Sequence, residues 1–107
     1  MISYLLLVSQ HFNMISEKAK KILSEHEEVA FYLRKVIEHI RPQKVILFGS
    51  KASGTSTSSS DTDFAIVSDS FIDTTEIFGA LDIVDLRRAS GNLRDEIIKE
   101  GIVIYER

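Results

Sequence analysis

The first long pattern in the chain is helical, with apolar residues recurring every three or four positions from Ile15 to Ile40. Charged residues occupy the positions between them, which is typical of a helix that packs one face on a core. Ser24, followed three residues later by Glu27, has the form of a capping box and predicts a break into two helices. Pro42 ends the pattern, because the residue before a proline disfavours the helical conformation.

Shorter apolar segments follow this helical region. Lys44–Phe48 is a continuous apolar run that stops at Gly49, which indicates a buried strand. Residues 51–60 are almost all small and polar and predict a loop. The remaining segments predict strands at Phe64–Val67, Leu81–Leu86 and Ile102–Tyr105, and a short helix at Asn92–Lys99 with Leu93, Ile97 and Ile98 on one side. This order of elements predicts an α+β fold in which helices pack on one small mixed β-sheet.

The composition is that of an ordinary globular domain. The chain has 107 residues, of which 44% are hydrophobic and 27% charged, enough for one domain and too few for two. We assign residues 14–107 to that domain and treat residues 1–13 as an N-terminal extension that is dispensable for chemistry. An edge strand, a contact surface for a partner, and an upstream start whose true initiator is Met14 all stay open for this extension.

Localisation follows from the only apolar run near the N-terminus, Ile2–Val8. It lacks the basic region and cleavage site of a secretory signal, and it is far shorter than the roughly 20 residues of a membrane-spanning helix. We therefore expect a cytoplasmic protein with no membrane partner.

Charge and cysteine content exclude further functions. The formal net charge of −3 provides no electrostatic footprint for a polyanion, so direct nucleic-acid binding is not expected. The chain has no cysteine, which excludes disulfides and thiolate metal sites.

Candidate chemistry is concentrated in Gly49-Ser50, ten further residues, and then Asp61-Thr62-Asp63. Asp61 and Asp63 are two apart at the entry to a predicted strand, so both side chains are expected on one face. Two carboxylates held so close repel one another, and a divalent cation relieves that repulsion most simply. Hard oxygen ligands of this kind suit Mg²⁺ or Mn²⁺.

A third carboxylate on a neighbouring strand would let the site hold two metal ions. Asp82 and Asp85 are the candidates, and because they are three apart they face opposite sides of a strand. Only one of the two can join the site.

Gly49 and Ser50 come directly off a buried strand, where they suit a phosphate group. Glycine lets the backbone approach a phosphate closely, and Ser50 adds a hydroxyl and a backbone N–H. A short helix beginning at Ser50 would favour an anion further. Lys51, the next residue, is an additional candidate for phosphate binding, although it can also be an ordinary surface lysine.

Simpler interpretations exist for the same residues. A Ser/Thr-rich loop needs no function, and Asp61 or Asp63 can cap a turn. A serine nucleophile at Ser50 is not supported, because all three histidines precede the motif and define no triad.

The pattern Gly49-Ser50, ten residues, Asp61-Thr62-Asp63 resembles the signature of the DNA polymerase β-like nucleotidyltransferase superfamily, and its minimal nucleotidyltransferase branch most closely. The likeness continues through the predicted strands and the last helix, over roughly residues 29–105. It implies a polymerase β palm-like nucleotidyltransferase fold. In this family the third metal carboxylate lies in a hydrophobic-Asp-hydrophobic strand, which corresponds to Asp82, with Asp85 as the second choice.

The resemblance also implies an activity and a partner. Members of the branch transfer a nucleoside monophosphate from a nucleoside triphosphate, usually ATP, in a reaction that depends on Mg²⁺. They are frequently paired with a small helical HEPN-type protein in a two-gene toxin–antitoxin module. Antitoxins of this branch attach AMP to a tyrosine of the toxin.

This chain departs from the family in several places. Members often carry arginine just after Gly-Ser and before the next glycine, where this chain has Lys51 and Ser53. The connection from Val67 to Leu81 leaves room only for a short helix around Thr74–Ala80. These departures leave a second interpretation open, an antitoxin with an idle nucleotide site that neutralises a small helical partner by binding alone.

Overall fold

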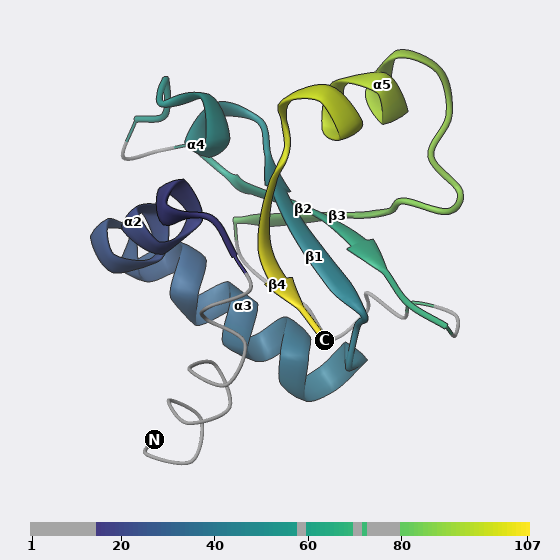
Figure 1. The fold of residues 1–107 in the computed structure, drawn as a ribbon, viewed down its shortest axis with the longest axis horizontal. Helices are drawn as coiled ribbons and strands as arrows, with labels where there is room; N and C mark the ends of the chain where they lie inside the picture. The colour runs from purple at the N-terminus through teal and green to yellow at the C-terminus, as the bar shows by residue number, and fades with distance from the viewer. Residues whose placement is uncertain (1–14, 58–59, 70–71, 73–79) are drawn as a thin grey trace.

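The computed structural model describes residues 15–57, 60–69, 72 and 80–107 (Figure 1). The proposed extension at residues 1–13 and most of the short helix expected around Thr74–Ala80 lie outside these residues. The elements are, in chain order, α2 (Glu17–Glu25), α3 (Glu27–Ile40), β1 (Lys44–Phe48), α4 (Ser50–Ser53), β2 (Thr62–Val67), β3 (Leu81–Asp85), α5 (Gly91–Glu100) and β4 (Ile102–Glu106).

The four strands form one mixed sheet in the order β3-β2-β1-β4. Strand β1 is antiparallel to both of its neighbours, β2 and β4, whereas β2 and β3 are parallel. The start of β2, β3 and β4 and the end of β1 therefore lie at the same end of the sheet, next to α4. The prediction of an α+β fold with a small mixed sheet is confirmed.

Alternating residues of the strands build a separate core on each face of the sheet. Val45 and Leu47 of β1 belong to the larger core, which α2 and α3 cover. Ile46 and Phe48 point the other way and pack with Ala65 and with Ile97 of α5. This period-two division of a continuous apolar run explains why β1 is buried on both faces.

The break in the predicted N-terminal helix falls at His26. The capping box at Ser24 is wrong, because the Ser24 hydroxyl donates to the Lys21 carbonyl, 2.8 Å away, inside α2. The second helix, α3, has His26 as its N-cap, and this residue makes no side-chain capping hydrogen bond. Ser16 caps the first helix, α2, by accepting a hydrogen bond from Ala19 N at 3.1 Å. Arg41 ends α3 in the left-handed region at φ 54°, directly before the proline that was expected to stop the helix.

The other element boundaries differ from the prediction by one or two residues, except that residues 51–53 of the predicted loop belong to α4. One packing prediction is wrong: Ile97 is buried, but Leu93 and Ile98 of α5 are 40% and 61% exposed. Helix α5 meets the sheet mainly through β1 and covers only a small core, and Ile97 is its one fully buried residue. None of the helices described here combines the length and hydropathy that crossing a bilayer requires.

Candidate active site

The parallel pairing of β2 with β3 brings two of the predicted carboxylates together. Asp63 of β2 and Asp82 of β3 are register partners, and Phe48 at the end of β1 is the partner of Asp63 on its other side. Asp63 is half-buried and Asp82 is exposed. The pair therefore lies at the end of the sheet where α4 begins.

The direction of the side chains separates Asp82 from Asp85. Asp63 and Asp82 each stand two residues before a residue of the smaller core, Ala65 and Val84 respectively. Residues two apart on a strand share a face, so both carboxylates lie on the face that α5 covers. Asp85 lies on the opposite face, in phase with Ile83. Of the two candidates, the structure places Asp82 beside Asp63.

Asp85 takes part in the turn that follows β3. Its carboxylate accepts a hydrogen bond from Arg87 N at 3.1 Å and lies 3.8 Å from Arg88 Nε. These contacts are sufficient to account for an aspartate at this position.

The Asp63 carboxyl is destabilised in its charged form. Burial raises the pKa of Asp63 above its ordinary value, and the neighbouring Asp82 raises it further through its charge and through hydrogen bonding. The charge of Asp61 acts in the same direction, while Lys51 lowers the pKa. An isolated surface aspartate would show none of these effects. A bound cation would stabilise the charged form of the Asp63 carboxyl.

Gly49, which follows β1, lies against the Asp63 side chain. Its backbone is in a positive-φ conformation (φ 75°, ψ −157°), which side-chain-bearing residues rarely adopt. A Cβ added at Gly49 would overlap Asp63 Oδ2. Glycine is therefore required at position 49 for two reasons: the backbone conformation, and the space that the Asp63 carboxylate occupies.

A short helix begins at Ser50, as the phosphate-binding prediction anticipated. The amides of Ala52 and Ser53 both donate to the Gly49 carbonyl, at 3.1 Å each. Among the described residues no acceptor is found for the amides of Ser50 and Lys51. Two N–H groups and the Ser50 hydroxyl are therefore available next to the carboxylate pair.

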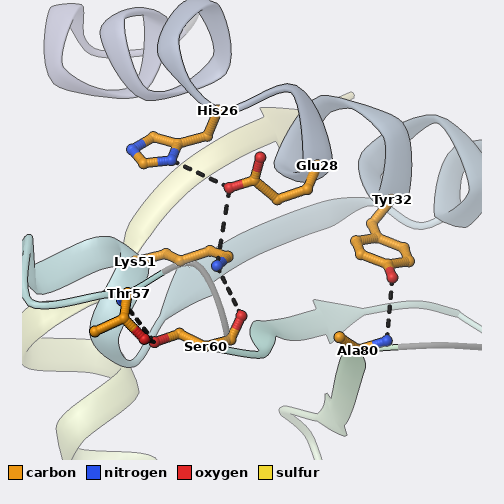
Figure 2. A network of polar contacts seen from close by, with 7 residues as sticks. All are labelled: His26, Glu28, Tyr32, Lys51, Thr57, Ser60 and Ala80. Carbon is orange, nitrogen blue, oxygen red and sulfur yellow. Dashed lines mark hydrogen bonds and ion pairs between the residues drawn. The ribbon is translucent and has the colours of Figure 1, made fainter.

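The Lys51 side chain turns into the protein (Figure 2). It is only 5% exposed, and its ammonium donates to the Ser60 carbonyl at 2.9 Å. It also lies 3.8 Å from the Glu28 carboxylate, which in turn contacts His26 at 3.2 Å. Lys51 thus connects α4 to the start of α3 and to the segment before β2, and its ammonium is engaged by protein groups.

Asp61 precedes β2 and is exposed. Within the described residues no group of three His, Cys, Asp or Glu side chains is close enough together to hold a metal ion. The carboxylate pair and the nearby charge of Asp61 do have the right chemistry for a hard divalent cation. The predicted set of three acids is therefore present as a close pair with a third acid within electrostatic reach.

Two backbone contacts hold the start of β3, and the sequence provided no signal for either. The Ala80 N–H donates to the hydroxyl of Tyr32 on α3 at 3.1 Å (Figure 2). The Ala80 carbonyl accepts from Thr62 N at 2.7 Å. Asp82 is two residues further along. Tyr32 therefore helps to fix the register that places Asp82 beside Asp63.

Replacing Tyr32 by phenylalanine is expected to lower the free energy of unfolding by about 0.5–1.5 kcal/mol, because one hydrogen bond is lost while the ring is retained. Metal-dependent ATP affinity should fall several-fold with it, because the start of β3 is less well held. Thermal unfolding and calorimetric titration would measure the two effects. Tyr105→Phe, which removes a hydroxyl at the opposite end of the sheet, should leave ATP affinity unchanged. Equal ATP affinity in Tyr32→Phe and the wild type would contradict this role.

The fold and the site together define a class of protein. A mixed sheet with a Gly-Ser turn leading into a short helix, next to paired carboxylates on the adjacent strands, is the arrangement of a nucleotidyltransferase domain. Residues 17–107 match the family model described as polymerase beta, nucleotidyltransferase, and the chain belongs to this family. The resemblance drawn from the motif is confirmed.

A solved structure provides a second comparison. A chain from the crystal structure of a toxin–antitoxin with AMP-PNP is similar to this chain with a TM-score of 0.58 and 24% sequence identity. The similarity covers 72% of this chain and 73% of that chain, and at this identity it shows a shared fold. No curated protein matches the chain.

Proposed function

We propose that this protein is a metal-dependent nucleotidyltransferase that transfers a nucleoside monophosphate, AMP from ATP, to an acceptor hydroxyl. The observation that carries the proposal is the pairing of Asp63 with Asp82 directly against Gly49, whose missing side chain leaves the space that the carboxylate fills. Family membership supports the general reaction. The identity of the nucleotide and of the metal belongs to the proposal alone.

Each group has a role in this reaction. The amides of Ser50 and Lys51 and the Ser50 hydroxyl bind the β- and γ-phosphates. Asp82 accepts the proton of the acceptor hydroxyl, directly or through water. The acceptor oxygen forms a bond to the α-phosphorus, the bond to the bridging oxygen breaks in line, and pyrophosphate leaves with that electron pair.

Asp61, Asp63 and Asp82 are the residues that would hold Mg²⁺ or Mn²⁺. Asp61 is exposed, so its side chain can change rotamer toward the pair at little cost. A bound divalent cation would supply charge neutralisation of the triphosphate and acidification of the acceptor hydroxyl. Burial is the largest cause of the raised pKa of Asp63, and cation binding would offset the second cause, the repulsion from Asp82 and Asp61.

The acceptor is proposed to be a tyrosine of a small helical HEPN-type toxin, with this chain as the antitoxin. The similar fold seen in a toxin–antitoxin with AMP-PNP supports this pairing of a protein partner with an adenine nucleotide.

A second function is favoured by the position of Lys51. Its ammonium is engaged by Ser60 and Glu28, and Ser53 stands where relatives often have arginine, so the phosphate site has little positive charge of its own. Such a chain could act as an interaction protein that neutralises its partner by binding alone. An Asp63→Asn variant that still neutralises the partner would establish this alternative.

Calorimetric titration of ATP into the full chain, with and without Mg²⁺, tests the proposed function. We expect binding that requires Mg²⁺ and that is lost in the Asp61→Asn/Asp63→Asn double variant. Binding of equal strength in the double variant would show that the carboxylates are not the metal site. Absence of binding to the chain alone and to its complex with the partner would leave only the interaction protein.

A further inference from the structure

A pocket of about 550 Å³ opens beside the Gly-Ser turn, and the proposed chemistry leaves it unused. Phe48, Gly49 and Ile102 contribute to its lining from the ends of β1 and β4. Ala52 and Ser53 of α4 form another part of the wall, and α2 and α5 supply charged side chains. Its volume lies within the range of roughly 300–1,000 Å³ typical of small-molecule sites.

Two lysines from different elements line this pocket, Lys18 of α2 and Lys99 of α5. Both side chains are exposed. In the part of the chain that the structure describes, neither lysine forms an ion pair. They contrast with Lys51, whose ammonium is already bound by protein groups, and they leave two positive charges available at one opening.

The pocket lies in line with the two carboxylates and Gly49 along this end of the sheet. The strand order places Asp82 on β3, Asp63 on β2, Gly49 after β1, and the pocket at the start of β4. Adjacent strands lie about 4.8 Å apart, so the distance from β2 to β4 is about 10 Å. A triphosphate whose α-phosphate lies at the carboxylates and whose β- and γ-phosphates extend along Gly49 and Ser50 therefore has its end beside the two lysines.

We propose that Lys18 and Lys99 bind the terminal phosphates of the nucleoside triphosphate, and the pyrophosphate that leaves, in this pocket. The inference rests on the proposed function and extends it to the residues that select a triphosphate over a monophosphate. Ser53 of α4 lines the same pocket, so the two lysines supply positive charge directly beside the short helix that follows the Gly-Ser turn. Lysine side chains bind phosphate as flexible point charges, which suits an open pocket.

Glu96 and Glu100 also line the pocket, and with all four groups ionised its charged side chains sum to zero. These carboxylates oppose anion binding, so they weaken the site without abolishing it. Their presence provides a test of opposite sign, because neutralising one glutamate should tighten binding of the same anion that a lost lysine weakens.

The experiment compares two double variants of the full chain that remove the same charge. Lys18→Met/Lys99→Met removes the two pocket lysines, and Lys35→Met/Lys44→Met removes two lysines that do not line the pocket. Titrations with ATP, AMP and inorganic pyrophosphate would be made in Mg²⁺ at constant ionic strength. We expect the pocket variant to bind ATP and pyrophosphate about tenfold or more weakly, three- to tenfold for each exposed lysine, and AMP within about twofold of the wild type.

The control variant should bind all three ligands within about twofold of the wild type. Glu100→Gln should bind ATP about two- to threefold more tightly, which keeps the inference testable even if the double lysine variant folds poorly. Unchanged ATP affinity in the pocket variant, or equal weakening of ATP and AMP, would overturn the inference while the proposed function stands. If the wild type shows no Mg²⁺-dependent ATP binding, either alone or in complex with its partner, the proposed function fails, and this inference fails with it.

Discussion

Replacing Asp63 by asparagine is expected to lower nucleotidyl transfer by about a thousandfold or more, while the folded protein becomes more stable in the absence of metal. Activity falls because the variant loses the half-buried carboxylate between Gly49 and Asp82. Stability rises because asparagine has nearly the same shape and no charge to repel Asp82 and Asp61. We expect a melting temperature that is higher by on the order of 2–4 °C at pH 7 with a chelator present.

The difference in melting temperature between the wild type and Asp63→Asn should depend on pH in a defined direction. The folded protein holds the Asp63 proton more tightly than the unfolded chain, so this carboxyl favours folding below its ordinary pKa of 3.8. That contribution is lost as the pH rises through the raised pKa of the folded state. The melting temperatures of the wild type and of Asp63→Asn should therefore be close at the acidic end and separate as the pH rises.

Thermal unfolding between about pH 3.5 and pH 7, followed for both proteins with a chelator, measures this separation. Adding Mg²⁺ at pH 7 should raise the melting temperature of the wild type only. Asp95→Asn, which changes an exposed aspartate on α5, is the matched control and should alter neither activity nor the pH profile. A gap between wild type and Asp63→Asn that does not change with pH would contradict the account of the Asp63 pKa.

Replacing Gly49 by alanine is expected to lower the free energy of unfolding by about 2–5 kcal/mol. Alanine at φ 75° costs about 1–2 kcal/mol, and the overlap of its Cβ with Asp63 Oδ2 adds about 1–3 kcal/mol. For a domain of this size the melting temperature should fall by about 10–20 °C. Activity at a permissive temperature should fall by about a hundredfold, because Asp63 must move away from its place.

Gly54→Ala is the matched control for this substitution. Gly54 ends α4 at φ 82°, but a Cβ added there would meet nothing within 4 Å. It should therefore show only the backbone cost of about 1–2 kcal/mol and should keep the activity. The double variant Gly49→Ala/Asp63→Ala should recover part of the lost stability, because the overlapping oxygen is gone. If Gly49→Ala and Gly54→Ala lost equal stability, the close approach to Asp63 would have no energetic weight.

Local patterns were enough to predict most of the elements. The strands around Lys44–Phe48 and Ile102–Glu106 and the helix before Pro42 follow from runs of apolar residues with a clear stop signal. The capping box at Ser24 failed because α3 has its N-cap at His26, two residues later, while the Ser24 hydroxyl donates to a carbonyl inside α2. Ser16, at the true start of α2, is the residue whose oxygen reaches the third amide of the helix.

The residues of the candidate site likewise fall into those that local sequence predicts and those that it does not. Gly49, Ser50, Asp61 and Asp63 lie within one short stretch, so their spacing alone predicts a phosphate cradle beside acids. Tyr32 was not predicted, because its contact with Ala80 joins residues 48 positions apart and leaves no local pattern. The pocket with Lys18 and Lys99 was missed for the same reason, since α2, α4, α5 and the start of β4 are brought together only by folding.

The sequence by itself therefore determined the family, the elements and the motif, because each depends on residues close together in the chain. Only the tertiary structure shows that Asp82, and not Asp85, lies beside Asp63, because this depends on which face of β3 packs against α5. It also decided the place of Lys51, whose burial between Ser60 and Glu28 depends on how α3 meets α4. Strand register and helix packing are sums over many distant contacts, and no short stretch of sequence contains them.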